Sequence, residues 1–117
     1  DVDFLFIDSS HIAKIGSDVN FLMFEVIPML KKNTVIHWHD IYIPFNYPKS
    51  IIEYVRRDSM YNESYIVQSF ISFNKSFEIL YSGQYLKRKH EEFLMDKFRY
   101  YLSTHNLTSF YVRKIST

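Results

Sequence analysis

The sequence contains no cysteine, and this absence excludes several kinds of chemistry. Disulfide bonds, thiolate metal sites and cysteine nucleophiles all require the thiol group. A chain without cysteine is typical of a reducing compartment, so we expect a cytoplasmic location. The sequence also lacks any apolar run approaching the roughly 18 residues that a membrane-spanning helix needs, and we expect no membrane partner.

Glycine is scarce, with only Gly16 and Gly83 where an average chain of this length has roughly 8. A nucleotide held on a glycine-rich loop needs several glycines close together in one turn. This chain therefore cannot bind a nucleotide in that way with its own residues. The sequence also begins inside a strand-like segment without a methionine, so we expect a fragment of a longer protein.

An excess of charge of one sign is missing as well. The chain has 14 basic and 13 acidic residues, which gives a formal net charge of +1. This balance provides no argument for a nucleic-acid partner, and we expect none. The chain has 117 residues, of which 47% are hydrophobic and 19% aromatic, which is enough for one domain with one core.

The first part of the chain has the pattern of a βαβ unit. An apolar run from Val2 to Asp8 ends in an acid, as buried parallel strands often do. Ser17 or Asp18 can cap a helix to about Lys32, and a second strand is predicted from Thr34 to His39. Two strands joined in this way should be parallel, with a right-handed crossover. The predicted apolar face of the helix consists of Val19, Leu22, Met23, Val26, Ile27 and Leu30.

The remainder of the chain is predicted to alternate between helices and strands, so the expected fold class is α/β. Its predicted helices are Ser50–Arg57, Asn62–Phe73 and Gln84–Ser103, and its predicted strands are Ser76–Tyr81 and Ser109–Ile115.

Chemically active side chains gather where the first two strands end. In open parallel sheets, ligands bind beyond the carboxyl ends of the strands, where Asp8, His39 and Asp40 are expected. His11 follows shortly after the first strand. Either His11 or His39 could remove a proton near neutral pH, with an aspartate to orient it. His37 lies inside the second strand, and we expect it to be a structural residue.

The same residues could bind a divalent metal ion. Asp8, His39 and Asp40 are the candidate ligands. Mg²⁺ prefers oxygen ligands, whereas a set that contains histidine suits Zn²⁺, Mn²⁺ or Fe²⁺ better. A metal-dependent hydrolase that uses these groups is therefore an alternative function.

Four segments follow one another in the order of a known family: DFLFIDSSH, GSDVNFLMFEVIPMLKKNTVIHWHDIYIPFNYP, YNESYIVQSFISFN and SFYVRK. Together they resemble the C-terminal half of a class I S-adenosylmethionine-dependent methyltransferase. The bacterial group with an FIDGSH-like motif after strand four and an HD motif after strand five is the most similar. The resemblance implies that residues 1–117 form a single partial domain, strands four to seven of a Rossmann-like sheet with flanking helices. The last strand should be antiparallel, and the N-terminal half that binds the cofactor is absent.

The resemblance also implies a function. The parent protein would transfer a methyl group from S-adenosylmethionine to an oxygen or nitrogen of a small-molecule acceptor. Asp8, His11, His39 and Asp40 would be its catalytic residues. Whether this chain alone is an enzyme stays open at this point.

Further residues are candidates for binding the acceptor. Tyr42 and Tyr47 could form an aromatic pocket, although such residues more often lie in a core. Asn62 and Glu63 could hydrogen-bond the acceptor or the HD loop, or alternatively begin a helix. The first strand would expose an unpaired edge, because its neighbour lies in the missing half. Exposed edges pair with other chains, so we expect self-association, or a non-catalytic half-domain that binds a partner.

Overall fold

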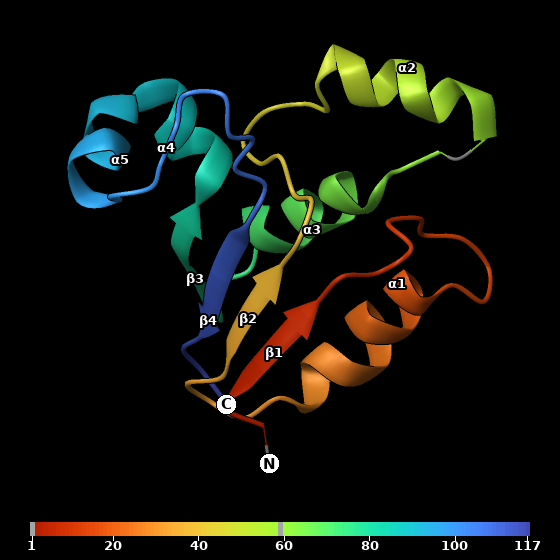
Figure 1. The fold of residues 1–117 in the computed structure, drawn as a ribbon. Coiled ribbons are helices and arrows are strands. Elements are labelled where there is room, and N and C mark those ends of the chain that lie inside the picture. The colour runs from red at the N-terminus through yellow and green to blue at the C-terminus, as the bar shows by residue number, and fades with distance from the viewer. Residues whose placement is uncertain (1, 59) are drawn as a thin grey trace.

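The computed structural model describes residues 2–58 and 60–117, and of residues 54–58 it describes only the backbone. The chain forms a four-stranded mixed sheet with helices packed around it (Figure 1). The expectation of an α/β fold is therefore confirmed at the level of its class.

The sheet has the strand order β1-β2-β4-β3. The strands are β1 (Phe4–Ile7), β2 (Val35–Trp38), β3 (Phe77–Ser82) and β4 (Phe110–Lys114). As predicted, β1 and β2 are parallel, and the last strand, β4, is antiparallel to both of its neighbours. The carboxyl ends of β1 and β2 therefore lie at the same edge of the sheet.

The crossover between β1 and β2 is a helical stretch that changes its hydrogen bonding twice. It consists of α1 (Asp18–Phe21), a π-helical turn η1 (Leu22–Val26) and a 3₁₀ turn η2 (Ile27–Met29). Ser17 caps it, as expected, by accepting a hydrogen bond from the Asn20 amide. The predicted end at about Lys32 is wrong, because the helical stretch stops at Met29. Pro28 has no N–H to donate to the preceding turn, which loosens the helix there, and Leu30 is already extended.

Two further helices follow β2 close to their predicted positions. These are α2 (Lys49–Asp58) and α3 (Glu63–Ser72).

The single helix expected over residues 84–103 is wrong. The structure has α4 (Gly83–Lys89) and α5 (Glu91–Lys97), which are separated at His90, and residues 98–109 are not helical. Basic residues are favoured at the last turn of a helix and acidic residues at the first turn. The sequence LKRK-H-EE therefore ends one helix and begins another, although its apolar spacing suits a continuous helix.

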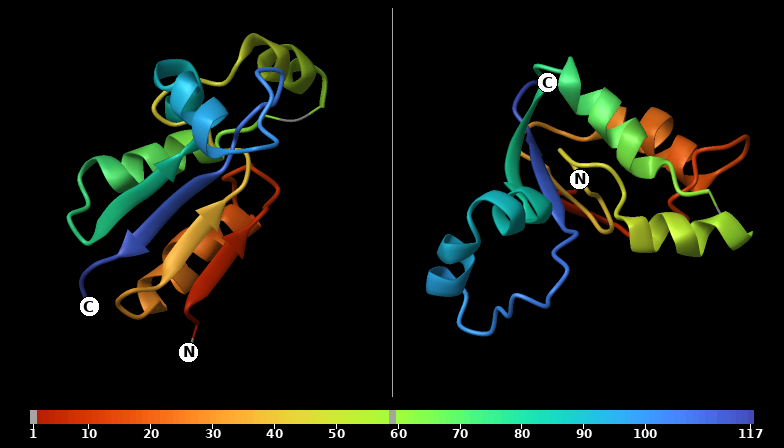
Figure 2. Two further views of the ribbon diagram at one scale, coloured as in Figure 1. Left: turned by 60° about the vertical axis from the view of Figure 1, so that its left-hand side comes forward. Right: turned by 90° about the horizontal axis from the view of Figure 1, so that it is seen from above.

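The core lies on one face of the sheet. The helical crossover and α3 cover this face, and α4 and α5 lie on the opposite side, beyond the end of β3 (Figure 2). The apolar face predicted for the crossover is confirmed except at Val26, since its other five side chains pack in or against the core with those of the strands. The principal buried members are Ile7, Val19, Met23, Ile27, Ile36, Trp38, Val67, Phe110 and Val112.

The opposite face of the sheet carries a row of aromatic rings. Phe6 packs against His37, whose ring stacks on Tyr111 with centroids 4.1 Å apart. Tyr81 meets Tyr111 edge to face, and Phe4 lies near both His37 and Tyr111. Among the described residues no strand pairs with the outer edge of β1.

The packing of the start of α4 against the loop before β4 can be tested at Gly83. A Cβ added there would lie 2.8 Å from the Leu107 carbonyl oxygen, which is closer than Cβ atoms normally approach. The loop before β4 would have to move, so we expect Gly83→Ala to lower the free energy of unfolding by about 1–3 kcal/mol in urea denaturation. Gly16→Ala is the comparison, because nothing lies within 4 Å of it and only its φ of +75° opposes the change. That strain amounts to about 1 kcal/mol. A Gly83→Ala variant as stable as the native chain would contradict the close approach.

No helix among the described residues has both the length and the apolar character needed to cross a membrane.

Candidate functional site

The ends of β1 and β2 bring four of the predicted site residues together. Asp8 follows β1 directly, and His39 and Asp40 follow β2. The strands stay in register up to this edge, since the His39 amide donates to the Ile7 carbonyl oxygen at 2.9 Å. His11 returns to the same place from the loop after β1. We call Asp8, His11, His39 and Asp40 the rim cluster.

The polar atoms of the rim cluster lie within a few ångströms of one another. His11 Nε2 is 3.5 Å from Asp8 Oδ1 and 3.4 Å from Asp40 Oδ2. His39 Nδ1 is 3.1 Å from Asp40 Oδ2 and 3.7 Å from Asp8 Oδ1. Each imidazole therefore has one nitrogen within 4 Å of both carboxylates.

A buried carboxylate from α3 holds His11 in place. Glu63 is only 1% exposed, and its Oε2 lies 2.8 Å from His11 Nδ1. Ser9 donates a second hydrogen bond to the same oxygen. The hydrogen bond to Glu63 raises the pKa of His11, while burial acts in the opposite direction. The negative charges of Glu63, Asp40 and Asp8 raise the pKa of His11 further, so the surroundings favour the protonated ring.

Two members of the rim cluster have a left-handed backbone conformation. The φ angles are 61° at His11 and 59° at Asp40. For residues other than glycine this conformation costs about 1 kcal/mol or more, and it persists where surrounding contacts enforce it. At His11 the carbonyl oxygen accepts hydrogen bonds from the amides of Asn62 and Glu63. The loop after β1 is thus fastened to the start of α3, with His11 turned toward the sheet.

Asp40 is oriented by a residue that the sequence did not indicate. The Thr108 hydroxyl donates to Asp40 Oδ1 at 3.0 Å, while the other oxygen faces the imidazoles. Thr108 precedes β4 and is distant from the HD motif in the sequence. Only the antiparallel pairing of β4 with β2 brings it there. No local pattern could have identified it.

The four residues predicted to bind an acceptor are occupied with contacts inside the chain. Tyr42 and Tyr47 are buried, and the Tyr47 hydroxyl accepts a hydrogen bond from the Ser64 amide. Burial raises the pKa of Tyr42 to about 12. Asn62 exchanges two hydrogen bonds with the backbone of Ala13. Like Glu63, these side chains support the residues that surround the rim cluster.

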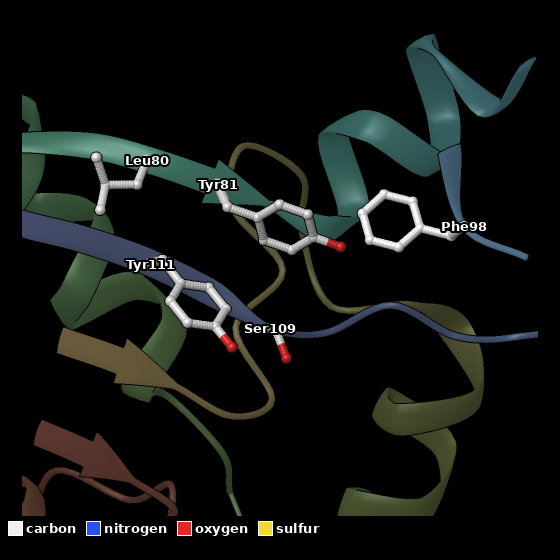
Figure 3. A pocket seen from close by; sticks show the side chains of 5 residues that line it. All are labelled: Leu80, Tyr81, Phe98, Ser109 and Tyr111. Atoms are coloured by element: carbon white, nitrogen blue, oxygen red, sulfur yellow. The ribbon is translucent and has the colours of Figure 1, made fainter. Parts of the chain in front are cut away.

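His37 lies apart from the rim cluster, in agreement with its predicted structural role. Its Nε2 is 2.9 Å from Ser109 Oγ, and burial lowers its pKa, which favours the neutral ring. A shallow pocket of about 400 Å³ lies on this aromatic face (Figure 3). It contains no member of the rim cluster. Its lining consists of Leu80, Tyr81, Phe98, Ser109 and Tyr111.

Comparisons of the chain with family models, with curated proteins and with solved structures find no match.

Proposed function

We propose that this chain supplies the acceptor side of an S-adenosylmethionine-dependent methyltransferase that modifies an oxygen or nitrogen of a small molecule. The observation that carries the proposal is the rim cluster, in which two imidazoles and two carboxylates meet at the carboxyl ends of neighbouring parallel strands. In α/β sheets this is where ligands bind. The reversed last strand also agrees with the resemblance on which the proposal is based.

The described residues do not form a complete site for S-adenosylmethionine. The only glycines, Gly16 and Gly83, lie in a loop after β1 and at the start of α4, so they do not build a glycine-rich turn. We therefore assign cofactor binding to polypeptide outside these residues. When bound, the cofactor provides a methyl group activated by a sulfonium, and the chemistry assigned here concerns the acceptor alone.

The acceptor must be aligned and must lose a proton. Asp8 and His39 have side chains that are 54% and 44% exposed, so an acceptor can reach them. His11 and Asp40 are less exposed and lie beside them. In this arrangement Asp8 and His39 bind the acceptor and take up its proton. His11 and Asp40 contribute charge and hold the first two side chains in position.

The proposal is tested on the natural polypeptide that carries these residues. We expect it to bind S-adenosylmethionine in calorimetry and to transfer its methyl group to a hydroxyl or amine in a panel of small acceptors. Because a positioned acid or base contributes about 100- to 10,000-fold, Asp8→Asn should lower turnover in that range and leave cofactor binding nearly unchanged. Asp96→Asn, an exposed carboxylate in α5, is the matched control. Absence of cofactor binding above background would exclude methyl transfer.

A metal-dependent hydrolase is the second candidate, and the histidine content of the rim cluster favours it. The two functions differ in what the natural polypeptide binds. Stoichiometric zinc or iron without binding of S-adenosylmethionine would favour hydrolysis over methyl transfer.

A further inference from the structure

His39 Nδ1 is a polar atom that the protein's own contacts leave without a hydrogen bond. It is buried and has no hydrogen-bond partner among the described residues. Oxygens of Asp40 and Asp8 are nevertheless only 3.1 and 3.7 Å away. The Asp8 oxygen lies beyond hydrogen-bond distance, and the Asp40 oxygen is near enough but does not meet the angular requirement of a hydrogen bond. A buried nitrogen beside two carboxylates is well placed to share a cation with them.

His11 is also oriented so that it can bind a cation at the rim cluster. A histidine that binds a metal usually donates its second ring N–H to a carboxylate, which fixes the tautomer and the orientation of the ring. Glu63 accepts from His11 Nδ1 in this way at 2.8 Å, and it is buried. Once an incoming cation has displaced the proton of Nε2, the lone pair of Nε2 is directed toward Asp8 and Asp40.

The four distances between imidazole nitrogens and carboxylate oxygens in the rim cluster are close to those around one ion. Ligand atoms placed tetrahedrally at about 2.1 Å from an ion are about 3.4 Å from one another. The contacts of His11 Nε2 with the two carboxylates are 3.5 and 3.4 Å, and those of His39 Nδ1 are 3.1 and 3.7 Å. One ligand atom each from Asp8, His11 and Asp40 can be chosen so that these three atoms lie within 4.8 Å of one another. His39 is not a member of this three-residue group, so its ring would have to turn toward the other ligands to complete a set of four.

We propose that the rim cluster is a transition-metal site, in which Asp8, Asp40, His11 Nε2 and His39 Nδ1 are the ligands and Glu63 orients His11. Two imidazoles and two carboxylates suit Zn²⁺, Co²⁺, Mn²⁺ or Fe²⁺, whereas Mg²⁺ prefers oxygen ligands and several waters. The site goes beyond the proposed function, because an ion that lowers the pKa of a bound hydroxyl or water serves methyl transfer and hydrolysis alike.

The test is a titration of the chain, freed of metal with a chelator, with the chlorides of Zn²⁺, Co²⁺ and Mg²⁺ in separate calorimetry experiments. We expect one Zn²⁺ or Co²⁺ per chain, and an affinity for Mg²⁺ at least about tenfold weaker. Bound Co²⁺ should show the visible absorption of a nitrogen- and oxygen-ligated ion. The titration contains neither S-adenosylmethionine nor acceptor, so its result is independent of whether methyl transfer occurs.

Three variants identify the ligands. His39→Gln changes a half-exposed side chain and should leave the circular dichroism spectrum unchanged, yet weaken Zn²⁺ binding at least about tenfold. Asp8→Asn should act in the same way. His37→Gln lies on the same strand but outside the rim cluster, and should bind Zn²⁺ like the native chain.

Three results would overturn the proposal. These are Mg²⁺ binding as tight as Zn²⁺ binding, absence of a stoichiometric ion, and a folded His39→Gln variant whose Zn²⁺ affinity equals that of the His37→Gln control.

Discussion

Replacing Glu63 with alanine is expected to destabilise the chain by about 3 kcal/mol, because it leaves the buried His11 and the partly buried Ser9 without their acceptor. Ser9 Oγ and His11 Nδ1 both bond to Glu63 Oε2 at 2.8 Å. Hydrogen bonds to charged groups contribute about 1.5–3 kcal/mol each, and His11 Nδ1 is left buried without a partner. Urea denaturation followed by circular dichroism measures the change.

Glu63→Gln is the matched variant, since it keeps the shape and one carbonyl oxygen that can still accept from His11. We expect a loss of stability of only about 1 kcal/mol, because a neutral hydrogen bond replaces a charged one. Its Zn²⁺ affinity should nevertheless fall by about 10- to 100-fold, which is typical when the partner of a metal-ligating histidine is changed. If Glu63→Ala proved as stable as Glu63→Gln, the buried hydrogen bonds would not hold the loop as described.

Replacing Trp38 with alanine is expected to have the largest effect on the fold. Trp38 is fully buried in β2, packs near Phe110 of β4 and belongs to the core between the sheet and the crossover. Truncation of a buried aromatic residue to alanine typically costs about 3–5 kcal/mol. Domains of this size have a total stability of about 5–15 kcal/mol. We therefore expect a greatly lowered denaturation midpoint, and partial unfolding at physiological temperature.

Phe24→Ala provides the control for Trp38→Ala. Phe24 lies on the outer side of the crossover and is 70% exposed, so its loss should change stability by no more than about 0.5 kcal/mol. Equal effects of the two substitutions on the urea midpoint would show that the core is not where the structure places it.

The βαβ unit could be predicted from the sequence because its signals are local. The apolar run before Asp8, the cap at Ser17 and the apolar spacing from Val19 to Leu30 each reflect the physics of a single element. Parallel pairing of β1 and β2 then follows from chain connectivity. The proximity of Asp8 to Asp40 could be predicted for the same reason.

The helix expected over residues 84–103 shows where periodicity misleads. Apolar residues recur at helical spacing through this segment, yet Leu94 is buried while Phe93 and Phe98 are about half exposed. The charges around His90 favour an end and a new beginning, and the Lys87 ammonium donates to carbonyl groups of Ser103 and His105 in the following loop. Such tertiary contacts override a local pattern.

The partners of the rim cluster could not be predicted, because they come from distant parts of the chain. Glu63 was identified as a site residue, but its position beside His11 depends on how α3 docks against the loop after β1. Thr108 reaches Asp40 only because β4 runs back along β2. The sequence shows which residues have reactive groups, whereas tertiary packing determines which of them are oriented and which are shielded.

Trp38 is the only tryptophan of the chain, and this gives the protein an intrinsic fluorescent probe. Its indole is shielded from water by the core, so its emission should be at short wavelength when the chain is folded and shift to the red on unfolding. It precedes His39 in the sequence, so a coloured or paramagnetic ion such as Co²⁺ at the strand ends would lie close enough to quench it. Light emission from one residue can thus follow both folding and ion uptake, without a label.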